Sequence, residues 1–195
     1  MINETAVKER PILFSAPMVC AILEDKKTQT RRVVNPQPWL EPDGELGWSS
    51  GGGYVEWNNG REDLSPYEVG TRLWVRETWH QHYAGGVLGG RPCYRADESC
   101  KAPEVVLPWK PSIFMPRWAS RITLEITGVR VERLQEISEE DARAEGVRPV
   151  NEQVELLGEY RIGYVKLWDS LNAKRGLGWD KNPWVWVIGF KRVTI

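Results

Sequence analysis

Apolar residues recur along this chain with two different spacings, and each spacing predicts a different element. The clearest strand pattern covers 121–134, where Ile122, Leu124 and Ile126 alternate with polar residues. A second alternation covers 184–194. Its apolar side chains are expected to share one face: Trp184, Trp186, Ile188 and Phe190. These two segments predict the longest strands of the fold.

Three short helices are predicted by capping residues and by spacing. Ser15 is a candidate N-cap before Pro17, and that helix should end near residue 25. Ser138 is a second N-cap, with Asp141 in a capping-box position and Gly146 as the stop. The third helix is predicted by apolar residues at i, i+3, i+4 and i+7: Tyr164, Leu167, Trp168 and Leu171.

The remaining segments are shorter or irregular. Short strands are predicted at 12–14, from Gly70 to Val75, and over 93–97. The stretch 35–66, rich in proline and glycine, predicts an irregular insertion with one hairpin. The glycines of 84–90 predict a flexible loop.

Strands and helices follow one another without the regular strand–helix–strand alternation of a doubly wound sheet. We therefore expect an α+β fold, a small β-barrel with short helices packed on it. A length of 195 residues fits a single domain over 1–195.

Composition excludes several classes of protein. The formal net charge is −1, so any attraction to nucleic acid must come from a local patch. The spacing of Cys20, Cys93 and Cys100 matches neither a disulfide framework nor a zinc site. We assign His80 and His82 to a surface loop and expect no metal or cofactor. With no apolar run and no signal-peptide pattern, we expect a cytoplasmic protein without a membrane partner.

The most informative polar stretch begins at Lys26, directly after the first predicted helix. It contains four cations and two threonines, a composition suited to binding phosphate or a polarised carbonyl. We expect Lys27, Thr30 and Arg32 to lie on one side of an extended segment and to floor a cleft. Lys26 and Arg31 are expected to be solvated.

A second polar cluster follows a predicted strand and joins cations to aromatic rings. Arg76, Glu77 and Trp79 are suited to reading a base edge and stacking on the base. Arg117 and Trp118 repeat the combination of arginine and tryptophan. The alternative is structural, an arginine–glutamate pair packed over a core tryptophan. Most of the eleven tryptophans are expected to serve such packing.

These motifs together resemble the ASCH domain family, and in particular its longer, tryptophan-rich prophage members. The motif residues are Asp25-Lys26-Lys27-Thr28-Gln29-Thr30-Arg31-Arg32, Gly70-Thr71-Arg72-Leu73 and Val187-Ile188-Gly189-Phe190-Lys191. The prophage-type residues are Arg76-Glu77-Thr78-Trp79, Met115-Pro116-Arg117-Trp118-Ala119-Ser120 and Asn182-Pro183-Trp184. The resemblance covers nearly the whole chain.

The resemblance implies a PUA-like fold, whose relatives bind RNA or modified bases. Some small ASCH proteins are amidohydrolases that remove the acetyl group from N(4)-acetylcytidine, and others have been described as ribonucleases. The family's catalytic lysine, threonine and glutamate fall on Lys27, Thr30 and Glu145 of this chain. In that mechanism Thr30 attacks the acetyl carbonyl, Lys27 accepts the proton of Thr30, and Glu145 protonates the leaving amine. Arg32 or a backbone N–H holds the oxyanion. A plain helix-end charge is the alternative for Glu145.

The chain departs from the family where two acids are usual, with Thr71 replacing an aspartate and Gly189 a glutamate. Binding tolerates such losses better than catalysis does. The leading hypothesis is therefore a module that binds a nucleoside, nucleotide or RNA. The expected ligand-binding residues are Arg32, Thr28, Arg76, Glu77, Trp79, Arg117 and Trp118. The alternatives are an amidohydrolase, a ribonuclease, or a phage-encoded protein-interaction module that docks a partner through 35–66.

Overall fold

A computed structural model describes most of the chain. The described residues are 7–40, 46–50, 53–57, 65–84, 87–97, 108–149 and 159–193. The chain forms two compact units. Unit 1 contains Met1–Lys26, Gly70–Glu125 and Lys191–Ile195, and unit 2 contains Lys27–Val69 and Ile126–Phe190.

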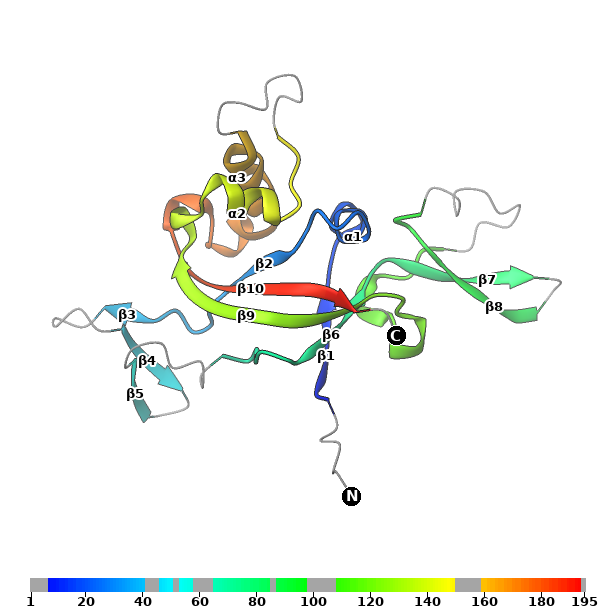
Figure 1. Ribbon diagram of the computed structural model, residues 1–195, viewed down its shortest axis with the longest axis horizontal. Coiled ribbons are helices and arrows are strands. Elements are labelled where there is room, and N and C mark those ends of the chain that lie inside the picture. The colour runs from blue at the N-terminus through cyan, green and yellow to red at the C-terminus, as the bar shows by residue number, and fades with distance from the viewer. Residues whose placement is uncertain are drawn as a thin grey trace. The chain divides into compact units, whose positions relative to one another are not determined.

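Within the described residues, ten strands form three sheets (Figure 1). The strands are β1 (Glu9–Leu13), β2 (Gln29–Val33), β3 (Trp39–Leu40), β4 (Leu46–Ser50), β5 (Gly53–Trp57), β6 (Arg72–Arg76), β7 (Trp79–Ala84), β8 (Val87–Tyr94), β9 (Thr123–Arg133) and β10 (Trp184–Val193). The largest sheet has the order β1-β6-β9-β10-β2. Its strands β1 and β6 are parallel, whereas β6–β9 and β10–β2 are antiparallel.

The helices are short and follow the predicted caps. They are α1 (Ala16–Leu23), α2 (Glu139–Ala144) and α3 (Glu159–Asn172), with single 3-10 turns η3 (Ser112–Phe114), η4 (Arg117–Ala119), η5 (Leu134–Glu136), η6 (Ala173–Arg175) and η7 (Trp179–Lys181). Ser15 is the N-cap of α1, and the Ser138 Oγ accepts a hydrogen bond from the Asp141 N–H at the start of α2. No helix in the described part of the chain is both long and apolar enough to cross a membrane.

The α+β class is confirmed, whereas the closed barrel is not. The five-stranded order begins at β1 and ends at β2, so the described strands form an open sheet. The predicted loop at 84–90 also needs correction. Ala84 lies in β7 and residues 87–90 lie in β8, which pairs with β7, and residues 85–86 fall outside the described part.

The predicted insertion contains more regular structure than one hairpin. Strands β3, β4 and β5 form a three-stranded antiparallel sheet within 35–66. The side chains of β4 and β5, on which a protein-docking role for this insertion would depend, lie outside the described residues.

The core of unit 2 lies between α2, α3 and one face of the large sheet. Tyr164 and Trp168 of α3 pack with Val185 and Val187 of β10, and Val33 of β2 packs against this cluster. The helix buries residues at i, i+4 and i+8, so Asn172 is buried and Leu171, predicted to face the core, is exposed. This packing determines which face of β2 meets the helices.

Candidate ligand-binding site

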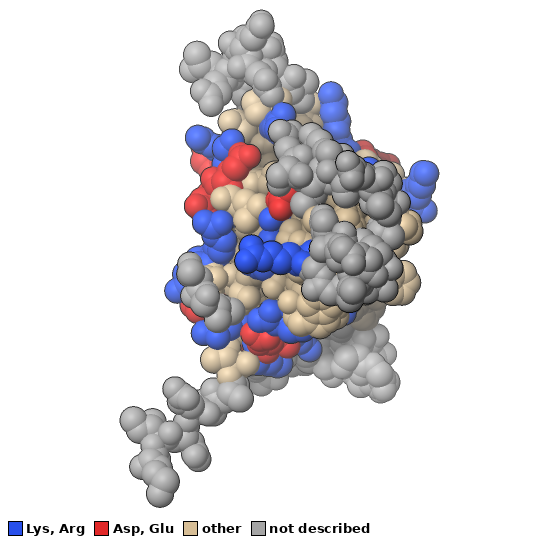
Figure 2. Space-filling view, turned by 90° about the vertical axis from the view of Figure 1, so that its right-hand side faces the viewer, with Lys and Arg blue, Asp and Glu red and all other residues tan. Residues whose placement is uncertain are grey.

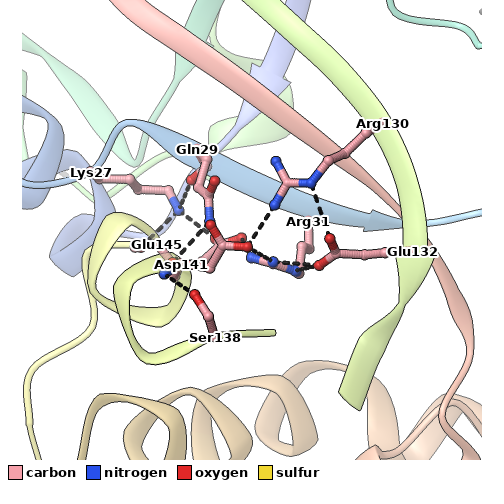
Figure 3. Close-up of polar contacts among 8 residues, drawn as sticks. All are labelled: Lys27, Gln29, Arg31, Arg130, Glu132, Ser138, Asp141 and Glu145. Carbon is pink, nitrogen blue, oxygen red and sulfur yellow. Dashed lines mark hydrogen bonds and ion pairs between the residues drawn. The ribbon is translucent and has the colours of Figure 1, made fainter. Parts of the chain in front are cut away.

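Strand β2 presents alternate side chains to α2 and β9. Lys27, Gln29 and Arg31 lie on one side of this extended segment, because successive side chains of a strand point to opposite faces. Figure 3 shows these three side chains facing Asp141 of α2 and Glu145 at the end of α2. The Gln29 Nε2 donates to the main-chain oxygen of Asp141 at 2.9 Å.

The ammonium group of Lys27 is fully engaged inside the protein. It donates to the main-chain oxygen of Gln29, the main-chain oxygen of Glu145 and the Glu145 Oε2, each at 2.8 Å. These contacts account for the three N–H donors of a lysine. Lys27 and Glu145 are each only 3% exposed. In this arrangement Lys27 also caps the last carbonyls of α2.

Arg31 joins the same cluster from the next alternate position. Its Nε donates to Glu132 Oε1 of β9 at 2.9 Å, and its Nη1 donates to Glu145 Oε1 at 3.1 Å. Its Nη2 reaches Asp141 Oδ2 at 2.6 Å. Arg130 completes the network by contacting Glu132 and Asp141 from the exposed side. Arg31 is buried, so the prediction that it is solvated was wrong.

The cluster balances its charges internally. Three cations meet three carboxylates: Lys27, Arg31 and Arg130 with Glu132, Asp141 and Glu145. A balanced network leaves little net field for attracting a phosphate. Figure 2 shows basic and acidic residues next to one another among the described residues of the face that it draws.

Burial and pairing shift the pKa values of three groups in this region. Burial lowers the pKa of Lys27, and the attraction of Glu145 offsets this only in part. Burial acts to raise the pKa of Asp141, but the Arg31 guanidinium outweighs it and holds that pKa below its ordinary value. Burial beside Glu145 raises the pKa of Tyr164 well above its ordinary value.

Thr30 and Arg32 lie on the other face of β2, which corrects the predicted grouping with Lys27. Thr30 is paired in register with Ile188 and Arg32 with Trp186, so these four side chains share the face away from α2 and α3. Thr28 belongs to this face by alternation, and its N–H donates to the Ala144 oxygen. Thr30 is buried and Arg32 is half-buried.

Four members of the cluster were not among the predicted site residues: Gln29, Arg31, Glu132 and Asp141. The two-residue spacing from Lys27 through Gln29 to Arg31 was a signal that could have identified the strand residues. The acids Glu132 and Asp141 carried no comparable signal, because only folding brings β9 and α2 to β2.

The second predicted cluster, Arg76, Glu77 and Trp79, lies in unit 1. Its Glu77 and Trp79 are buried, as residues with a structural role are. Glu77 is buried and accepts two hydrogen bonds from Arg121, from Nε at 2.9 Å and from Nη2 at 3.1 Å. Burial raises the pKa of Glu77, and Arg121 opposes this shift. The guanidinium of Arg76 lies 4.6 Å from the ring centroid of Trp74.

The aromatic residues around this cluster differ strongly in exposure to solvent. Trp79 is buried with Met115 and Ala119, whereas Trp118 is 63% exposed. Arg117 is ion-paired with Glu9 at 2.8 Å. His80 is buried in β7, with its ring edge-on to Trp109. His82 also lies in β7, with its side chain outside the described part, so the assignment of both histidines to a loop was wrong.

Comparison with known proteins gives one structural similarity. The crystal structure of an ASCH domain from Lactobacillus crispatus JV V101 is similar to this chain, with a TM-score of 0.44 and 15% sequence identity. The match covers 95% of this chain and 79% of that one. No protein-family model matches the sequence, and no curated protein matches it.

Proposed function

We propose that this chain is an ASCH-type module that binds a nucleotide, a modified base or RNA, and that it does not use Lys27, Thr30 and Glu145 as a catalytic set. The observation that carries the proposal is the separation of Lys27, just before β2, and Thr30, in β2, onto opposite sides of one extended segment. A nucleophile and its base must lie within hydrogen-bond reach of one another.

The state of Lys27 supports the same proposal. All three of its ammonium donors are engaged, and both carboxylate oxygens of Glu145 accept hydrogen bonds, from Lys27 and Arg31. Such a closed network holds β2 against α2. Arg32 projects from the opposite face, half-buried and in register with Trp186. An arginine beside an aromatic ring suits contact with a base or a phosphate.

The amidohydrolase is the second candidate, and one observation favours it. The Lys27 Nζ and the Glu145 Oε2 lie 2.8 Å apart. Burial lowers the pKa of Lys27, which is how a lysine becomes able to act as a general base. This pair could move a proton if a substrate displaced one of the contacts of Lys27.

Binding and hydrolysis can be measured on the same samples. The wild-type protein is mixed with cytidine, cytidine monophosphate, N(4)-acetylcytidine or a single-stranded RNA of about 12 nucleotides. We expect at least one of these to raise the melting temperature, as any ligand of the native state must, without release of acetate. Acetate release that Lys27→Ala and Glu145→Gln both abolish would establish the hydrolase instead. Absence of any binding would refute the module.

Arg32→Ala tests the position of the ligand. Loss of one charge-assisted contact should weaken binding by about 1.5–3 kcal/mol while the melting temperature of the unliganded protein changes little. Lys166→Ala, which removes an exposed cation from α3, is the matched control and should bind as wild type does. Equal affinities for both variants would place the ligand elsewhere.

A further inference from the structure

We propose that residues 108–121, called here the 108–121 segment, form a surface on which bases of single-stranded nucleic acid stack. The inference rests on the proposed function and deepens it, because it assigns the surface and the kind of nucleic acid. It concerns unit 1, in which none of the residues of the Lys27 cluster lies.

The segment concentrates exposed apolar side chains. Ile113 is 58% exposed, Phe114 70% and Trp118 63%, all within six positions. The other large exposed apolar residues of the described chain are spread over several elements, as is usual at a protein surface. Two of the three residues in the segment are aromatic, and each offers a ring to the solvent.

The exposed rings are held by a rigid backbone. Lys110 and Trp79 exchange two main-chain hydrogen bonds, of 3.2 and 2.8 Å, which tie the start of the segment to β7. The turns η3 and η4 follow. Met115, between Phe114 and Trp118, and Ala119, directly after Trp118, are fully buried. The Tyr94 hydroxyl donates to the Ala119 oxygen at 2.8 Å. Rings fixed in this way lose little freedom when a base stacks on them.

The exposed ring of Trp118 packs against the buried ring of Trp79. The two rings meet edge-on, with centroids 5.7 Å apart and an interplanar angle of 89°. The ammonium of Lys110 lies 5.0 Å from the Trp79 ring centroid. The Trp79 Nε1 is buried without a hydrogen-bond partner. Such a donor is costly, because buried polar groups normally have a hydrogen-bond partner.

The charge of the segment favours a polyanion over a protein partner. It contains Lys110, Arg117 and Arg121 and no acidic residue, in a chain whose net charge is −1. Arg117 pairs with Glu9, and Arg121 pairs with Glu77 and Asp97. The Arg117–Glu9 pair is partly exposed, and such surface pairs contribute little, so a phosphate could replace the carboxylate. Aromatic rings next to cations are the pattern of proteins that bind single strands.

The test compares variants that keep or remove a stacking ring. Wild type, Trp118→Tyr and Trp118→Leu are titrated with a labelled single-stranded RNA of about 12 nucleotides, and the dissociation constant is measured by anisotropy. We expect Trp118→Leu to bind about 5- to 100-fold more weakly, because one stacked base is lost, and Trp118→Tyr to stay near wild type. Phe114→Leu should behave as Trp118→Leu does. Leu171→Ala, at an exposed apolar site of α3, should change nothing.

The outcomes separate this inference from the proposed function. If wild type binds the RNA and Trp118→Leu binds equally well, the stacking surface is refuted and the binding module stands. If wild type binds no RNA, the stacking surface is refuted, and the binding module then depends on whether cytidine, cytidine monophosphate or N(4)-acetylcytidine binds. If the protein instead self-associates and Trp118→Leu abolishes the association, the surface docks a second copy of the chain and the stacking proposal is wrong. Circular dichroism of each variant confirms that the fold is intact.

Discussion

At the scale of single residues, burial decides the roles of the charged groups. Lys27 and Arg31 belong to one short basic stretch with Lys26 and Arg32, yet the first two are buried and paired while the other two are at least partly exposed. Burying a charge is costly unless partners replace its water. The carboxylates of α2 and β9 provide those partners, whereas the exposed Lys26 pairs with Glu24 at the surface.

Tyr164 yields a prediction about pH at this scale. Its pKa is raised in the folded protein, so above about pH 10 the unfolded chain loses a proton that the folded chain keeps. Stability due to this hydroxyl is therefore complete below that pH and is lost as pH rises, by up to about 1.4 kcal/mol per unit. Tyr164→Phe keeps the ring and should escape this loss.

The comparison of Tyr164→Phe with wild type isolates the hydroxyl. The pKa of Lys27 is lowered in the folded protein, so below the ordinary pKa of a lysine the free energy of unfolding rises with pH. Wild type and Tyr164→Phe share this contribution, so it cancels in the comparison. Urea unfolding at about pH 8 should give similar free energies, and at about pH 11 the variant should be the more stable. A difference that does not change with pH would contradict the prediction.

At the scale of elements, α2 depends on β2 as much as β2 depends on α2. A six-residue helix has too few internal hydrogen bonds to be stable by itself. The Ser138 hydroxyl accepts a hydrogen bond from an N–H of the first turn of α2. The Lys27 ammonium and the Thr28 N–H donate to the main-chain oxygens at the end of α2. The acidic residues of the first turn interact favourably with the positive end of the helix dipole. One of them, Asp141, also accepts a hydrogen bond from Arg31.

Arg31→Gln should therefore destabilise the fold much more than Arg130→Gln. Arg31 is buried among three carboxylates, and breaking a buried pair costs about 3–5 kcal/mol. Arg130 contacts two of the same carboxylates from the exposed side, where an ion pair contributes less than about 1 kcal/mol. Urea unfolding of the two variants measures the difference, and equal losses would show that the cluster does not hold β2 in place.

At the scale of the whole molecule, charge must act locally, since the chain as a whole is almost neutral. Attraction to nucleic acid depends on the number of phosphates that are neutralised, and each contact on a single strand contributes about −0.7 to the slope of log K against log salt. The cations of the 108–121 segment that lie toward solvent are few. A shallow salt dependence is therefore expected.

The corresponding measurement is the affinity for single-stranded RNA from low to moderate salt. We expect a slope of about −1.4 to −2.1, which corresponds to two or three phosphate contacts. Lys110→Gln should reduce its magnitude by about 0.7, whereas Lys166→Gln, on the exposed side of α3, should leave it unchanged. A slope steeper than about −5 would require a large basic surface and would contradict a local site.

Much of the local structure could be predicted because it depends on neighbours in the sequence. The alternation around Leu124 predicted β9, Ser138 and Gly146 bounded α2, and the pattern of Trp186 and Ile188 predicted β10. Strand alternation and helix capping need only residues a few positions apart. The resemblance to ASCH domains likewise depended on short motifs.

Only the tertiary structure decided which of the predicted site residues meet. Lys27 and Glu145 are 118 positions apart and come together at 2.8 Å. Thr30, three positions from Lys27, is directed to the opposite face of the same strand. Leu171 matched the helical pattern and is exposed, while Arg31 was expected in solvent and is buried. Local spacing determines the elements, but burial and long-range ion pairs depend on how those elements pack, and that packing is a property of the whole fold.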